Sequence, residues 1–86
     1  MKHAGGEALD RLESLLAQIR LLPNLKEKKR GLFYLKGRSL LHFHEDPAGL
    51  FADVAWRGED IRLRVSEPEE QRRLLETVAG FLGEKS

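Results

Sequence analysis

Short apolar runs alternate with turn sequences throughout residues 32–65, and this rhythm constrains the fold more than any other feature of the chain. The runs are LFYLK, SLLHFH, LFADVAW and IRLRV, which have the lengths and the aromatic or β-branched content of strands. Gly37, the EDPAG cluster at 45–49 and Gly58 separate the runs, and these residue types favour tight turns. Strands joined by such short turns pair with their sequence neighbours. The sequence therefore predicts a four-stranded antiparallel meander.

An amphipathic helix is predicted on each side of these strands. Within residues 8–22, leucine and isoleucine recur at steps of three and four, with charged residues between them. Ser66 with Glu69 three residues later is typical of a helix start, and Gly83 fits the end of that helix. The basic segment 25–30 is expected to be a connector. The predicted order of elements is α-β-β-β-β-α.

The length of 86 residues indicates one α+β domain spanning 1–86, with both helices packed on one face of the sheet. The chain has no cysteine, which excludes disulfides and thiolate metal ligands and fits a reducing compartment. It has no apolar signal-peptide segment and no run of about 18 apolar residues, so we expect a cytoplasmic protein with no membrane partner. The net charge is only +1, so any surface for nucleic acid would be a local patch.

Alternation along the strands sorts the side chains into two predicted faces. The face expected to carry the helices comprises Phe33, Leu35, Leu40, His42, His44, Leu50, Ala52, Val54, Trp56, Ile61, Leu63 and Val65. On the other face, Asp53 is expected to pair with Arg64. Five apolar residues on that face would be left uncovered: Leu32, Tyr34, Leu41, Phe43 and Phe51. Because monomers rarely expose such a patch, we predict that these five residues form the interface of a homodimer.

The motif His42-x-His44-x-Asp46 is the strongest candidate for chemistry in the sequence. Side chains two apart on a strand point to the same face, so His42 and His44 could bind one divalent metal, with Asp46 as a third ligand. Asp53 is an alternative third ligand, although the predicted register places it on the opposite face. A structural interpretation stays open, in which His42 is a hydrogen-bonded core residue and Asp46 accepts backbone amides in its turn. General acid/base catalysis is a further alternative. No catalytic residue can be named.

Motifs for other chemistry are absent from the sequence. It contains no G-x-S-x-G nucleophile elbow and no G-x-x-x-x-G-K-[ST] phosphate loop, so no cofactor other than a metal is indicated. The sequence leaves the identity of any small-molecule ligand open. Arg62 and Arg64 beside Tyr34, Phe43 and Phe51 could form a stacking platform for single-stranded nucleic acid, although the order of elements differs from an RNA-recognition motif.

The segment LKGRSLLHFHEDPAGLFADV resembles small bacterial domains, mostly uncharacterised, that are sometimes labelled luciferase-like. The resemblance covers residues 31–65, and His42, His44, Asp46 and Asp53 are the positions that carry it. It implies no reaction. The sequence thus favours a non-enzymatic, homodimeric interaction module, with a metal-binding protein or metal-dependent enzyme as the first alternative and a nucleic-acid-binding protein as the second.

Overall fold

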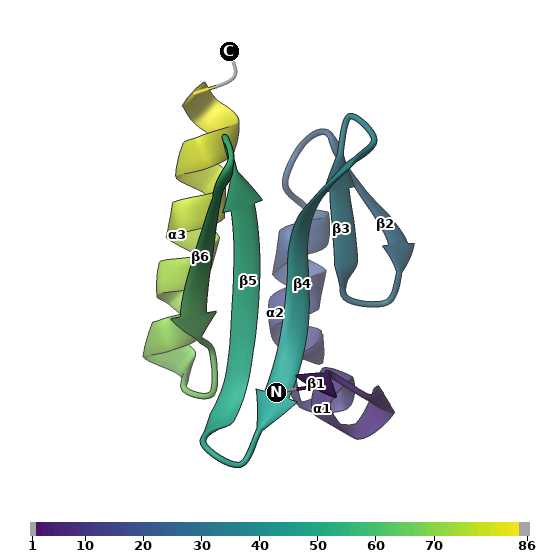
Figure 1. Ribbon diagram of the computed structural model, residues 1–86, viewed down its shortest axis with the longest axis vertical. Coiled ribbons are helices and arrows are strands. Elements are labelled where there is room, and N and C mark those ends of the chain that lie inside the picture. The colour runs from purple at the N-terminus through teal and green to yellow at the C-terminus, as the bar shows by residue number, and fades with distance from the viewer. Residues whose placement is uncertain (1, 85–86) are drawn as a thin grey trace.

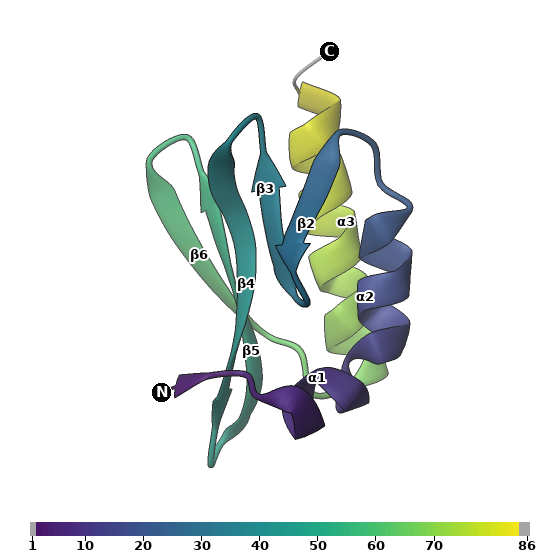
Figure 2. The same ribbon diagram turned by 90° about the vertical axis from the view of Figure 1, so that its right-hand side faces the viewer.

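The computed structural model describes residues 2–84 and arranges them as an antiparallel sheet with helices on one side (Figures 1 and 2). The strands are Lys2–His3 (β1), Leu25–Lys29 (β2), Leu32–Leu35 (β3), Arg38–Asp46 (β4), Gly49–Trp56 (β5) and Glu59–Arg64 (β6). The helices are Gly6–Arg11 (α1), Glu13–Arg20 (α2) and Pro68–Glu84 (α3). The main sheet order is β2-β3-β4-β5-β6, and β1 pairs with β4. The predicted α+β class with an antiparallel sheet and helices at both ends is confirmed, but the predicted count of four strands is too low.

The predicted connector at 25–30 contains the edge strand β2. Its sequence, LKEKK, has no run of apolar residues because an edge strand of this sheet faces water along most of its length. Charged side chains on an edge also oppose pairing with another chain. The predicted helix over 8–22 is divided into α1 and α2 at Leu12, which lies between them in a non-helical conformation.

The core lies between the sheet and the helices, which all cover the same face of the sheet (Figure 2). Helix α2 contributes its apolar stripe of Leu15, Leu16 and Ile19, and α3 contributes Leu74 and Val78. The strands supply the opposite wall, with Phe33, Leu35, Leu40, Leu41, Phe43, Leu50, Ala52 and Val54. Amphipathic periodicity therefore places the two longer helices on the sheet, as the sequence predicted.

A β-bulge in β4 decides which face each later side chain of that strand occupies. Phe33 pairs with Leu41 whereas Tyr34 pairs with Ser39, so Leu40 is an extra residue in the ladder. Both Leu40 and Leu41 are buried, at 3% and 0% exposure. One inserted residue reverses the alternation beyond it, because side chains alternate with a period of two.

This reversal corrects the predicted faces of β4. His42 and His44 lie on the face of the sheet opposite the helices, which we call the open face, and not among the core residues. Leu41 and Phe43, predicted to lie on that face, are in the core instead. The faces predicted for β5 and β6 are correct, since Ala52 and Val54 are buried against the helices.

The predicted homodimer interface loses two of its members through this correction. Leu41 and Phe43 are buried within the chain, so they are not part of an uncovered patch. Leu32, Tyr34 and Phe51 are half-buried. Homodimer formation stays a prediction.

The start of α3 also differs from the predicted capping pattern. The Glu70 carboxylate accepts a hydrogen bond from the Glu67 backbone N–H at 2.9 Å, one residue beyond the predicted Ser66 and Glu69 pair. Ser66 instead accepts a hydrogen bond from the Leu50 N–H at 2.8 Å and so ties the start of β5 to the segment before the helix. Among residues 2–84, no helix is long and apolar enough to cross a membrane.

Candidate metal centre

Three imidazoles meet on the open face of the sheet. His42 and His44 come from β4, and His3 comes from the short strand β1. His3 pairs directly with His44 in the β1–β4 ladder, so their side chains emerge on the same face. One ring nitrogen from each of the three residues lies within 4.8 Å of the others. We call these three residues the histidine cluster.

The rings of the cluster are in direct contact. The centroids of His42 and His44 are 4.8 Å apart with the rings nearly perpendicular, at 72°. His3 stacks on His44 with a centroid distance of 4.9 Å, and it lies 5.9 Å from His42. His3 is exposed, whereas His42 and His44 are half-buried, so solvent reaches the cluster from the side of His3.

Strand β1 is held against β4 by contacts that involve the residues flanking His3. The Ala4 N–H donates to the Phe43 carbonyl at 3.1 Å. The Gly5 N–H donates to the Glu45 carboxylate at 2.7 Å, and the Lys2 ammonium lies 3.9 Å from the same carboxylate. Glu45 therefore anchors β1 on both sides of His3.

Asp53 supplies a negative charge next to the cluster. It pairs with His42 in the β4–β5 ladder, and its Oδ2 lies 2.9 Å from His44 Nε2. The sequence prediction placed Asp53 on the opposite face from the histidines, and this is wrong because the bulge brings His42 and His44 to the face of Asp53. The side chain of Asp53 is mostly buried, at 15% exposure.

Arg62 fixes the position and the charge of Asp53. Its guanidinium donates to both carboxylate oxygens, at 2.7 and 2.8 Å. These hydrogen bonds hold the pKa of Asp53 below its usual value, so the carboxylate is ionised at neutral pH. The predicted pairing with Arg64 is wrong, since the turn between β5 and β6 makes Arg62 the direct cross-strand partner. Arg64 contacts Glu70 instead.

Several buried nitrogens of the cluster have no hydrogen-bond partner among the described residues. They are Nδ1 of His42 and both Nδ1 and Nε2 of His44. The 2.9 Å approach of His44 Nε2 to Asp53 is close enough for strong electrostatic attraction but lacks the direction of a hydrogen bond. Buried polar groups are rarely left unsatisfied, so these three atoms require partners that residues 2–84 do not supply, either water or a bound ion.

Burial keeps His42 in the form that binds metals. Desolvation lowers the pKa of His42 below its usual value of 6.5, and His44 and, more weakly, His3 lower it further, whereas Asp53 and Asp60 oppose the shift. A neutral imidazole has a free lone pair on one nitrogen, which is the atom that a metal ion requires.

The structure brings together two of the three predicted metal ligands. Asp46 is not in the cluster, and its carboxylate accepts a hydrogen bond from the Ala48 N–H at 3.0 Å, as the structural interpretation of the turn predicted. His3 takes its place, and the motif did not predict this residue. A histidine near the start of the chain has no fixed spacing to the motif, and only the pairing of β1 with β4 brings it there.

Comparison of the chain with models of protein families, with curated proteins and with solved structures finds no match. The luciferase-like resemblance is therefore an expectation from the sequence alone.

Proposed function

We propose that this protein binds a divalent transition-metal ion through His3, His42 and His44. The observation that carries the proposal is the meeting of three imidazoles, from two strands, around buried nitrogens without hydrogen-bond partners within residues 2–84. Among the alternatives taken from the sequence, metal binding is the one that accounts for this arrangement.

The donor set indicates which metals fit. Imidazole nitrogen favours zinc, copper, nickel and cobalt, whereas magnesium and calcium prefer oxygen ligands. Tetrahedral zinc with Zn–N bonds of about 2.0–2.1 Å needs nitrogens about 3.3 Å apart. The nitrogens of the cluster lie within 4.8 Å, so small rotations of the imidazole rings would bring them onto the ion. Zinc is the metal that we expect.

Asp53 and Arg62 support the same proposal from outside the ligand set. Histidine ligands usually direct their second ring nitrogen toward a carboxylate or carbonyl, which orients the ring and increases its basicity. The Asp53 carboxylate lies 2.9 Å from His44 Nε2, so a small rotation of the ring would give it this relationship and leave Nδ1 of His44 for the metal. The ionised carboxylate also offsets part of the positive charge of the ion.

Two consequences follow for function. The metal would fasten the N-terminal strand β1 to β4, because His3 belongs to one and His42 and His44 to the other.

Three protein ligands also leave a fourth tetrahedral position for water, on the exposed side of the cluster. Zinc acidifies such a water, so the chemistry available at this site is activation of water for attack on an electrophile.

Calorimetric titration with zinc tests the proposal. We expect one ion per chain at neutral pH, and loss of at least tenfold in affinity in each of His3→Ala and His44→Ala. Asp46→Asn is the matched control, because it removes a charge from the motif but keeps an oxygen that can accept the turn hydrogen bond. Wild-type protein that takes up no zinc, or affinity that depends on Asp46 and not on His3, would contradict the proposal.

A further inference from the structure

A second candidate site lies at the Arg38 end of β4. The histidine cluster lies further along the same strand, toward its Asp46 end. The ladder between β4 and β5 ends at the Leu41–Val54 pair. Beyond it, β4 pairs only with β3 and β5 pairs only with β6, so the two hairpins diverge. A cavity of about 340 Å³ occupies the space between them. We call it the hairpin cleft, and its volume falls within the range of sites for small molecules.

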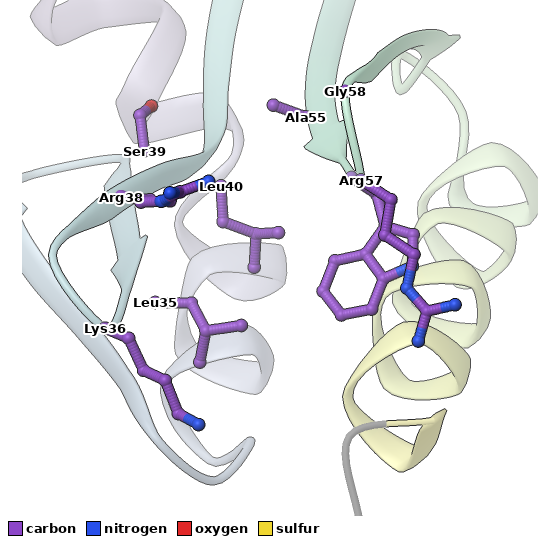
Figure 3. A pocket seen from close by; sticks show the side chains of 9 residues that line it. Leu35, Lys36, Arg38, Ser39, Leu40, Ala55, Arg57 and Gly58 are labelled. Carbon is purple, nitrogen blue, oxygen red and sulfur yellow. The ribbon is translucent and has the colours of Figure 1, made fainter.

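The floor of the hairpin cleft is apolar. Leu35 and Leu40 project into the space between the hairpins (Figure 3) and are buried in the chain, at 9% and 3% exposure. Trp56 lines the other wall and is fixed by parallel stacking on Phe81 of α3, with ring centroids 4.9 Å apart. This floor would accept a hydrocarbon or aromatic group.

The rim of the same cleft is cationic. Figure 3 shows Lys36 and Arg38 on one side and Arg57 on the other, and the residues that line the cleft include no aspartate or glutamate. Arg57 lies 3.6 Å from Glu84, but within residues 2–84 neither Lys36 nor Arg38 forms an ion pair. The guanidinium of Arg57 also lies over the Trp56 ring, at 5.6 Å from its centroid. Two cations are thus free to bind an anion at the rim.

Two of the rim cations, Lys36 and Arg57, occupy equivalent positions in two turns of the same conformation. Lys36-Gly37 and Arg57-Gly58 both have positive φ at each of their two residues, which is the conformation of a tight type I′ hairpin turn. Both turns lie at the same end of the sheet, which is also the end where α3 finishes (Figure 1). Asparagine is the residue that this first turn position favours, so a long cation there costs conformational energy. Two such cations converging on one cavity indicate a role in binding.

From the apolar floor and the cationic rim, we propose that the hairpin cleft binds a small amphipathic organic anion, an aliphatic or aromatic group that carries one carboxylate or phosphate. The apolar group lies against Leu35, Leu40 and Trp56, and the anionic head contacts Lys36 and Arg38, with Arg57 closing the other side. This inference is independent of the proposed metal site, which lies elsewhere on β4.

Trp56 is the only tryptophan of the chain, so its fluorescence reports directly on the hairpin cleft. The probe is octanoate, added far below the concentration at which it forms micelles, with 1-octanol as the uncharged control of the same chain length. We expect a saturable fluorescence change with octanoate that weakens with added salt, and much weaker binding of octanol. Octyl phosphate then shows which head group is preferred.

The double variant Lys36→Asn/Arg57→Asn removes two cations while introducing the residue that the turns favour, so it should fold at least as stably as the wild type. We expect its affinity for octanoate to fall by about threefold to tenfold, as for the loss of two partly exposed charge contacts. Arg11→Gln/Arg73→Gln lowers the net charge equally at exposed helix positions outside the cleft and should bind normally. The proposal would be overturned if neither octyl anion gave a saturable fluorescence change, or if octanol bound equally well. An equal loss of affinity for octanoate in both double variants, or binding to anionic vesicles alone, would also overturn it.

Discussion

The guanidinium of Arg62 holds both carboxylate oxygens of Asp53, at 2.7 and 2.8 Å, and the same carboxylate lies 2.9 Å from His44 Nε2. A single chain of contacts therefore connects an exposed arginine on β6, through β5, to the histidine cluster on β4. Because Asp53 is mostly buried, Arg62 is the residue that keeps it ionised and in place.

Arg62→Gln should weaken metal binding without removing a ligand. Loss of an outer-shell partner typically costs tenfold to 100-fold in metal affinity, and we expect the lower part of this range because Asp53 itself remains. Asp53→Asn should cost more, since it removes the charge next to His44. Titration calorimetry measures both, with Arg64→Gln as the control on the same strand. Equal affinity in Arg62→Gln and the wild type would show that Asp53 does not depend on its arginine.

The metal-free protein should lose stability as the pH falls below about 6.5. Burial lowers the pKa of His42 in the folded state, so the unfolded chain takes up its proton at a higher pH than the folded chain. The part of the free energy of unfolding that depends on His42 is fully present above its unfolded pKa of 6.5. It is lost as the pH falls from there through the lower pKa of the folded protein. Thermal melts between about pH 8 and 5, a range that spans the usual histidine pKa of about 6.5, measure this loss of stability. His42→Gln should flatten the curve of stability against pH. A steeper curve in that variant would contradict the assignment.

A second acid-sensitive contact joins α2 to β2. Glu27 accepts hydrogen bonds from Arg20 at 2.6 and 3.1 Å and from the Gly31 N–H at 2.9 Å. The Arg20 contact is the main cause of the lowered pKa of Glu27. The contact therefore stabilises the fold fully above the ordinary pKa of 4.5, and this stabilisation is lost as the pH falls through the lower pKa of Glu27 in the folded protein. Glu27→Gln should lower the free energy of unfolding by about 1 kcal/mol at pH 7 and by less at pH 3. Chemical denaturation at both pH values measures the difference, and an equal loss at both would contradict it.

Phe43 and Phe51 should respond differently to truncation because they lie on opposite faces of the sheet. Phe43 is 3% exposed in the core, so Phe43→Ala should lower the free energy of unfolding by about 3–5 kcal/mol through a cavity. Phe51 is half-buried on the open face, and Phe51→Ala should cost clearly less. Urea denaturation measures both values. Similar small losses would restore the face assignment predicted from the sequence.

The helices and most strands could be predicted because their signals are local. The apolar stripe of α2, the alternation of β6 and the glycines at 37 and 58 each depend on neighbouring residues, and each appears in the expected element. Strand β2 was missed because its charged sequence is suited to an edge, where apolar periodicity is absent. The division at Leu12 leaves the helical periodicity almost unchanged, so the sequence does not reveal it.

The candidate site could be predicted only in part, because it depends on a bulge and on a distant strand. The motif made His42 and His44 share a face, and they do. Which face they occupy depends on one extra residue, Leu40, and two adjacent leucines carry no sign of which is inserted. His3 joins the cluster through the β1–β4 pair, a long-range contact with no counterpart in local spacing.

X-ray absorption spectroscopy of the zinc-loaded protein at neutral pH tests the metal site most directly, because it counts the imidazoles bound to the ion. We predict three imidazole nitrogens at about 2.0 Å and one oxygen from water. His3→Ala should remove one imidazole, and Asp46→Asn should leave the spectrum unchanged. A shell of oxygen ligands with one imidazole or none, or the same nitrogen count in His3→Ala as in the wild type, would contradict a metal centre built from His3, His42 and His44.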